Sequence, residues 1–378
     1  MINQHQIQSG VKVLVGPPGS FAWLRVQGPL THEKLGGLTP VKGGVDAEGH
    51  PVYSARGFCG ASDQRVVGGQ VKLGSEGTVF NYNILVYKSP LYHFHNASGE
   101  YSTKNIWSAV KFGSINSSII SISPTAVEPP SIALAFTEID MQHNSSDNHN
   151  VRAKAYVDSI TTRDFRVHID TWSSTILYNG GVSWLKIATG DPDFRSGVFK
   201  CTSETSAWID FDWRFNYQPA VFVGISAFDI GAARVNSWQL KVYASDITPT
   251  GFCMNIDQPG GANQFAGCSV TWVAYAMNKP GVAGGTFGGN ELTSSKYTGR
   301  TYFPRWFKNP PAVFLGISAF DIPKDNNIRL VVEKWVQGKE YMDWEIRTYA
   351  GSKLQAVRVN YLALDLNPYT AEELRGLR

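Results

Sequence analysis

The chain contains an internal repeat, which constrains its fold more than any other feature of the sequence. Residues 219–230 read PAVFVGISAFDI and residues 311–322 read PAVFLGISAFDI, so eleven of twelve positions are identical at an offset of 92 (311 minus 219). Residues 130–141, PSIALAFTEIDM, form a weaker third copy, in which Asp140 precedes Asp229 by 89 residues. Such a period indicates copies of one structural unit.

Each copy continues with the same series of β-strand signals. After the first copy come VRAKAYVDSI, DFRVHID and GVSWLKIA, and after the third come IRLVVEKWVQ, YMDWEIRTY and RVNYLALD. These runs alternate with period two and are rich in Val, Ile, Trp and Tyr, which is typical of strands. No segment of useful length has helical periodicity. About six short strands in each repeat predict a small antiparallel sandwich.

The first ninety residues lack this repeat. Their Gly-rich stretches, TPVKGGVDAEGHPVYSARGF and VVGGQVKLGSEG, are typical of short strands and tight turns. We therefore predict an all-β protein with a small N-terminal β domain at residues 1–95. Three tandem six-stranded antiparallel β-sandwiches follow, and these are called repeats 1, 2 and 3: residues 96–190, 191–280 and 281–378.

The charge and hydropathy of the chain exclude several classes of partner. The formal charge is +3, from 34 basic and 31 acidic residues without a basic run, which argues against nucleic acid binding. No apolar stretch approaches the roughly 20 residues of a membrane span. The first residues, MINQHQIQSG, lack the basic and apolar regions of a secretion signal. We expect a cytoplasmic or unconventionally secreted protein that does not insert into membranes.

Neither a metal site nor a cofactor is expected. The four cysteines form no CxxC pair, and His143 and His149 lie in a polar stretch that is typical of a solvated loop. Cys253 and Cys268 could end neighbouring strands and form a disulfide, or remain free thiols.

Catalysis is not expected either. The sequence has no GxSxG, HExxH or phosphate-binding loop, and no pair of carboxylates that stands out in an apolar surround. A glycosidase and a structural or pore-associated module remain as alternatives to a binding protein.

The ordered set of motifs resembles the H-type lectins, the family of snail agglutinins and of the C-terminal domain of discoidins. In repeat 1 it comprises Pro129-Pro130, Asp140, Asn150-Val151-Arg152, Trp172, Tyr178 and Trp184. The resemblance covers about residues 105–378. It implies a six-stranded sandwich that usually trimerises and binds galactose or N-acetylgalactosamine near the contacts between neighbouring domains. Three repeats in one chain could then form a pseudo-trimer within a single polypeptide.

The resemblance also implies which residues bind sugar. In repeat 1 they are Arg152, Trp172, Ser173 and Tyr178, and in repeat 3 they are Arg329 and Tyr349, with Glu291 as a candidate carboxylate. An arginine presents a rigid fork of donors to hydroxyl groups, and an aromatic ring offers a flat surface to the C–H face of a hexose.

Repeat 2 departs most from the motif. Gln239 stands where the arginine is expected, and Gly260 and Ala266 stand in the aromatic positions. We therefore expect the strongest site in repeat 1, a weaker one in repeat 3 and a weak or silent one in repeat 2.

Structural roles are open for several of these residues. The two arginines could form surface ion pairs, which contribute little to stability. Trp184 and Trp272 lie in alternating strands, which favours a core position. Asp140, Asp229 and Asp321 end the same strand in each copy, which favours a turn or interface role over ligand contact.

The N-terminal domain resembles the small β repeat of natterin-like fish toxins and of some invertebrate mannose-binding proteins. The similarity rests on GGVDAEGHPVYSAR and VGGQVKL, and it implies mannose recognition by Asp46 and Lys72. Taken together, the sequence predicts a multivalent lectin whose partners are glycans of glycoproteins or cell surfaces.

Overall fold

The structure of the protein is a computed structural model. It describes residues 21–35, 40–45, 47, 50–59, 65–72, 81–87, 97–105, 115–123, 126, 129–142, 150–189, 191, 193–202, 205–212, 214–215, 217–231, 237–257, 265–277, 279, 281–292, 294–304, 307–323, 327–336 and 338–366. The chain divides into two compact units, one formed mainly by residues before 94 and one mainly by residues 94–378.

The N-terminal unit is a five-stranded sheet with the strand order β1-β5-β3-β2, and β4 pairs with β3. The strands are β1 (Phe21–Gln27), β2 (Lys42–Val45), β3 (Pro51–Cys59), β4 (Arg65–Lys72) and β5 (Asn81–Tyr87), with one short helix, α1 (His32–Leu35). Leu30 and Ile84 are fully buried in its apolar cluster. The predicted small N-terminal β domain is thus confirmed as a fold.

The second unit contains the strands of the three repeats. Repeat 1 forms β6 (Ala97–Ser102), β7 (Ile115–Ser121), β8 (Ser131–Met141), β9 (Val151–Asp158), β10 (Asp164–Asp170) and β11 (Leu177–Ile187). Repeat 2 forms β12 (Phe194–Cys201), β13 (Ser206–Asp210), β14 (Ala220–Ile230), β15 (Ser237–Ser245), β16 (Gly251–Asp257) and β17 (Phe265–Tyr275). Repeat 3 forms β18 (Val282–Asn290), β19 (Lys296–Tyr302), β20 (Ala312–Pro323), β21 (Ile328–Trp335), β22 (Tyr341–Arg347) and β23 (Ala356–Leu364).

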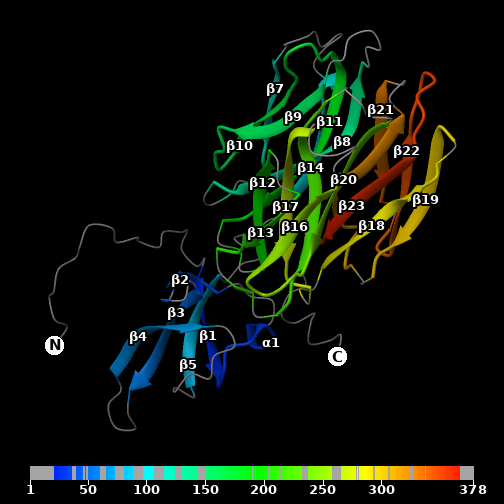
Figure 1. The fold of residues 1–378 in the computed structure, drawn as a ribbon. Helices are drawn as coiled ribbons and strands as arrows, with labels where there is room; N and C mark the ends of the chain where they lie inside the picture. The colour runs from blue at the N-terminus through cyan, green and yellow to red at the C-terminus, as the bar shows by residue number, and fades with distance from the viewer. Residues whose placement is uncertain are drawn as a thin grey trace. The chain divides into compact units, whose positions relative to one another are not determined.

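These strands make three six-stranded sheets, and each sheet is shared by two repeats. The 1/2 sheet has the order β12-β17-β14-β9-β10-β7, the 3/1 sheet β19-β22-β21-β8-β11-β6, and the 2/3 sheet β13-β16-β15-β20-β23-β18. Each repeat therefore contributes three strands to each of two sheets (Figure 1). The predicted all-β fold of six-stranded antiparallel repeats is confirmed, and the sharing of sheets links every pair of repeats.

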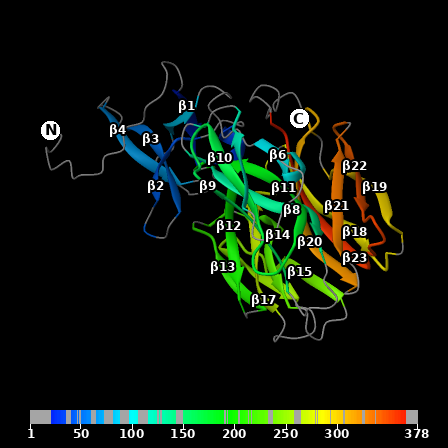
Figure 2. The same ribbon diagram turned by 90° about the horizontal axis from the view of Figure 1, so that it is seen from above.

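The repeated apolar motif forms the long strands β8, β14 and β20, which lie side by side in both views (Figure 1 and Figure 2). Their residues are buried almost continuously, as expected of strands that are covered on both faces. Each strand has a register shift at the equivalent residue, which is Thr137, Ser226 or Ser318. Such a bulge bends a strand and strengthens its twist.

Small residues allow these three strands to approach one another. A Cβ atom built on Gly224 would lie 2.6 Å from the Cβ of Ala135 and 3.3 Å from the Cα of Gly316. Ala135, Gly224 and Gly316 occupy the same position of the motif (224 minus 135 is 89, and 316 minus 224 is 92). The rings of Phe222 and Phe314 lie 4.6 Å apart within the same central cluster.

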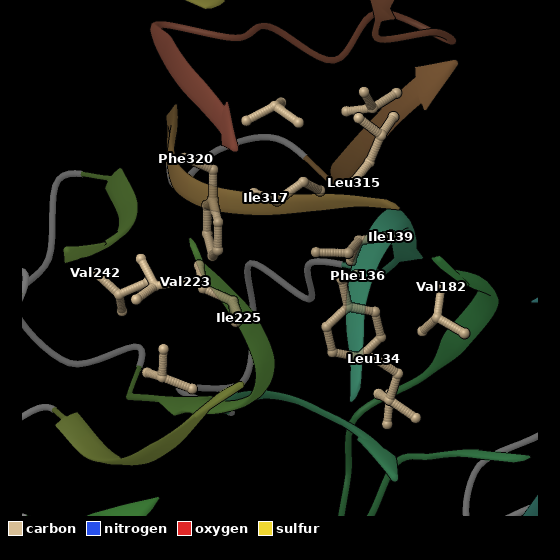
Figure 3. Packing of buried hydrophobic residues seen from close by; sticks show 14 of the residues in the cluster. Leu134, Phe136, Ile139, Val182, Val223, Ile225, Val242, Leu315, Ile317 and Phe320 are labelled. Atoms are coloured by element: carbon tan, nitrogen blue, oxygen red, sulfur yellow. The ribbon is translucent and has the colours of Figure 1, made fainter. Parts of the chain in front are cut away.

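A larger apolar cluster fills the sandwiches. It joins side chains of all three repeats, including Phe136, Ile225 and Ile317 (Figure 3). Trp184 and Trp272 are each 8% exposed in this cluster, which confirms the predicted core positions. The equivalent residue of repeat 3, Tyr361, is 3% exposed.

The structure does not contain the possible disulfide between Cys253 and Cys268. Cys253 lies on β16 of the 2/3 sheet, whereas Cys268 lies on β17 of the 1/2 sheet, directly opposite Cys201 on β12. None of these three cysteines forms a disulfide in the described part of the chain. The sequence could not separate these alternatives because β16 and β17 are consecutive in the chain but belong to different sheets. In the described part of the chain, no helix is both long and apolar enough to cross a membrane.

Candidate functional site

Each shared sheet contains a junction where a strand of one repeat meets a strand of the next. At the 1/2 junction, Arg152 on β9 lies opposite Asp229 on β14, and its Nε atom donates to Asp229 Oδ2 over 3.1 Å. The amide of Asn150 donates to the other carboxylate oxygen over 2.6 Å. The two charged side chains are 15% and 19% exposed, so solvent screens this ion pair less than a surface pair.

The 3/1 junction repeats this arrangement. Arg329 on β21 lies opposite Asp140 on β8, and its Nε atom donates to Asp140 Oδ1 over 3.3 Å. The guanidinium carbon lies 5.6 Å from the ring centre of Tyr349, within the range of a cation–π contact. Burial and a hydrogen bond with Asp140 raise the pKa of Tyr349. The structure thus brings Arg329 and Tyr349 together, as the resemblance implied.

The 2/3 junction uses neutral donors. Gln239 on β15 lies opposite Asp321 on β20, and its amide donates to Asp321 Oδ2 over 2.9 Å. Burial raises the pKa of Asp321, against the opposing effect of hydrogen bonds from Ser237 and Gln239. A depression of about 230 Å³ opens beside this pair.

The three aspartates are therefore contacts between repeats, which confirms the expected interface role. The two arginines are ion-paired as well, but their pairs are partly buried and join different repeats. Arg152 Nη1 is buried and has no hydrogen-bond partner among the described residues. Part of its donor capacity is thus left unused by the protein.

Trp172 lies next to the 1/2 junction, in the connection between β10 and β11. The hydroxyl of Thr171 donates to the carbonyl of Arg152 over 2.9 Å, and that of Thr175 donates to the carbonyl of Asn150 over 2.7 Å. These bonds fasten the connection to the start of β9. Trp172 itself is 38% exposed, so its ring is open to a ligand.

Ser173 follows Trp172 with a φ of 59°, in the left-handed region that non-glycine residues rarely occupy. Tyr178 lies on β11 of the 3/1 sheet, is 40% exposed and donates from its hydroxyl to Gln142 Oε1 over 2.7 Å. Its neighbour Asn179 pairs with Asp140. Tyr178 is therefore placed toward Asp140, whereas Trp172 is placed beside Arg152.

Glu291 directly follows β18 and is exposed. The next amide, Leu292 N, donates to the carbonyl of Gln355 over 2.9 Å, and Gln355 N donates to the carbonyl of Asp321 over 2.8 Å. The structure therefore places Glu291 near the 2/3 junction, on a different sheet from Arg329. A role in sugar binding stays a prediction for Glu291 and for the other candidates.

The proposed mannose residues are described only in part. Lys72 ends β4, where its backbone pairs with Val52, and Asp46 lies outside the described residues. His143 and His149 also lie outside them. Within the described ranges, no group of His, Cys, Asp and Glu is arranged to hold a metal ion.

Sequence reasoning missed the charged residues beside the junctions. Glu138 on β8 is 7% exposed and is bound by Lys104 and by the hydroxyl of Ser102. Its position was a detectable signal, because TEIDM has a glutamate where both copies of SAFDI have an alanine. Arg358 was missed because its position is Gly181 in repeat 1 and Ser269 in repeat 2.

The family model of the H-type lectin domain matches three segments of the chain, which are residues 127–187, 206–275 and 298–364. Each segment lies within one repeat and contains the long apolar strand of that repeat. The junction aspartate lies near the C-terminal end of this strand. No individual curated protein matches the chain.

Proposed function

The chain belongs to the H-type lectin domain family, a family of carbohydrate-binding domains, and we propose that its sugar sites are the junctions between repeats. The observation that carries this proposal is the recurrence of one geometry. At each junction an aspartate of one repeat accepts hydrogen bonds from a side chain of the next repeat. Such a cluster offers both donors and acceptors to sugar hydroxyl groups.

The 1/2 junction is the strongest candidate for a galactose-type ligand. It combines the fork of Arg152 with the exposed ring of Trp172, which can cover the apolar face of a hexose. The 3/1 junction combines Arg329 with Tyr349, and we expect weaker binding there because Tyr349 already donates to Asp140.

The proposed lectin is multivalent within a single chain. Every pair of repeats shares one sheet, so one polypeptide supplies three junctions that differ in their side chains. Presenting several weak sites together raises the apparent affinity for a glycan-bearing surface. This arrangement supports the proposal that the three repeats of one chain take the place of three identical subunits.

Substitution of Trp172 gives the cleanest test. Losing an aromatic contact removes about 0.5–1.5 kcal/mol beyond area burial, so Trp172→Ala should weaken galactoside binding about two- to tenfold. Its melting temperature should stay close to that of the wild type because the ring is exposed. The matched control is Trp335→Ala, which removes another aromatic ring from the end of β21. Trp335 is 44% exposed, close to the value for Trp172.

Calorimetric titration with methyl α-galactoside and N-acetylgalactosamine would measure both variants. Equal binding by the Trp172→Ala and Trp335→Ala variants would contradict the assignment of Trp172. Arg152→Ala is less informative, because it leaves Asp229 in a partly buried contact with only one donor and costs stability as well.

A further inference from the structure

We propose that the depression at the 2/3 junction binds a neutral, hydroxyl-rich ligand of monosaccharide size between Asp321 and Arg358. This inference rests on the proposed carbohydrate-binding function and assigns a site where the sequence predicted a weak or silent one. The depression measures about 230 Å³, and its polar lining consists of Gln239, Lys241, Asp257, Asn290, Asp321 and Arg358. It lies below the roughly 300 Å³ at which pockets for drug-sized ligands begin, which suits a single sugar ring.

Asp321 supplies an unused acceptor. At the 1/2 junction both carboxylate oxygens of Asp229 accept hydrogen bonds, from Arg152 and Asn150. At the 2/3 junction the carboxylate of Asp321 interacts with Ser237 and with the shorter Gln239, whose amide donates to Oδ2. Oδ1 is buried and has no hydrogen-bond partner among the described residues. A buried acceptor without a donor is costly, and a ligand hydroxyl would satisfy it.

Arg358 supplies an unused donor at the same place. It lies on β23 opposite Ala319, two residues before Asp321 on the neighbouring strand. Its side chain is exposed, and no residue in the described part of the chain forms a hydrogen bond or an ion pair with its guanidinium group. Repeats 1 and 2 have Gly181 and Ser269 in this position, so the long cation is particular to the 2/3 junction.

The charges around the depression favour a neutral ligand. Lys241 and Asp257 form an ion pair over 2.6 Å, which leaves Arg358 and Asp321 as the charged lining residues that form no ion pair with a described residue. A carboxylate or sulfate on the ligand would be attracted by Arg358 but repelled by Asp321, and a cation would meet the opposite balance. A hydroxyl group can donate to Asp321 Oδ1 and accept from Arg358 at once.

The replacement of an arginine by Gln239 therefore changes the site rather than removing it. Where an arginine binds the aspartate, the carboxylate is occupied by the protein. Where Gln239 binds it, one oxygen remains for a ligand and Arg358 provides the charged donor in place of the missing fork. We accordingly expect a sugar preference that differs from that of the 1/2 junction.

The test uses the whole 378-residue chain with Trp172→Ala, which weakens the 1/2 site, and compares additional substitutions by calorimetric titration. The probes are methyl α-galactoside, methyl α-glucoside, methyl α-mannoside, glucuronic acid and N-acetylneuraminic acid. At least one neutral glycoside should still bind. Adding Arg358→Ala should weaken binding of the glycoside that the 2/3 junction prefers at least tenfold, and Asp321→Asn should do so as well, whereas weak galactoside binding at the 3/1 junction should stay unchanged. Arg163→Ala, which removes an exposed arginine between β9 and β10, should change it less than twofold.

Three results would each overturn the inference while the proposed function stands. The first is that Arg358→Ala and Asp321→Asn leave neutral-sugar binding within twofold of their parent while both variants keep its melting temperature. The second is that Trp172→Ala abolishes binding of every neutral glycoside. The third is that the acidic sugars bind more tightly than the neutral ones through Arg358. If the wild-type protein binds none of the probes, the proposed function fails and this inference fails with it.

Discussion

The arginines at the junctions are held by partners that lie far away in the sequence. Arg152 binds a carboxylate 77 residues ahead, and Arg329 binds one 189 residues behind. These distances explain why local motifs identified the arginines but not their partners. A buried lysine whose pKa is lowered by its burial is therefore an informative test of the interior.

Lys186 provides that test. It lies on β11, is 1% exposed, and burial lowers its pKa to about 8. An unfolded lysine has a pKa near 10.4, so between about pH 8 and pH 10.4 the unfolded state binds more protons than the folded state. The free energy of unfolding should therefore gain about 2 kcal/mol from this group as the pH rises from 7.5 to 9.5.

Lys186→Met should remove this gain. Urea unfolding at pH 7.5 and pH 9.5 would measure it, with the exposed Lys339→Met as the control variant that keeps the wild-type difference. An unchanged pH dependence in the Lys186→Met protein would show that the lysine remains charged and well solvated in the folded state.

At the scale of strands, close packing at one position of the repeated motif holds the three long strands together. The sequence predicted these strands from their apolar runs, and it predicted Trp184 and Trp272 as core residues. It did not predict which strands pair between repeats, because a strand buried on both faces loses the period-two pattern that marks its covered side. Burial of Lys186 escaped notice for the same reason.

Gly224→Ala tests this packing. The new Cβ would lie 2.6 Å from that of Ala135, so the strands must separate, which should cost about 1–3 kcal/mol of unfolding free energy. Ala135→Gly in the same protein should restore part of the loss. The control is Gly338→Ala, because a Cβ on Gly338 meets no atom within 4 Å. Equal stability of the Gly224→Ala and Gly338→Ala proteins in urea would contradict the close packing of Gly224 against Ala135.

The thiols report on the strand pairing of the 1/2 sheet. Cys201 and Cys268 face each other across β12 and β17 and are 4% and 5% exposed, and burial raises the pKa of the Cys268 thiol. In a Cys59→Ser protein, a thiol reagent at pH 8 should modify the half-buried Cys253 first, and the opposed pair only after unfolding. Mass spectrometry of peptides would identify the sites. Early modification of Cys268 would argue against the pairing of β12 with β17.

The stability of the whole second unit depends on the sheets that the repeats share. A single repeat contributes only three strands to each of its two sheets, so on its own it would expose the edges of β8 and β9 that pair with other repeats. Unpaired edges promote association and weaken a small sandwich. Repeat 1 expressed as residues 96–190 should therefore not give a folded monomer, whereas residues 94–378 should unfold as one cooperative unit. Ultracentrifugation and circular dichroism would decide, and a folded monomeric repeat 1 would contradict this dependence.

The location of the sugar site can be measured directly through the indole signals of tryptophan. The chain has 11 Trp, and Trp172 is exposed at the 1/2 junction, whereas Trp184, Trp238 and Trp272 are buried. In a nitrogen-15 labelled protein titrated with methyl α-galactoside, the Trp172 signal, assigned by its loss in Trp172→Phe, should shift with saturation. The three buried signals should stay in place. A Trp172 signal that remains unmoved while the galactoside binds would contradict the account.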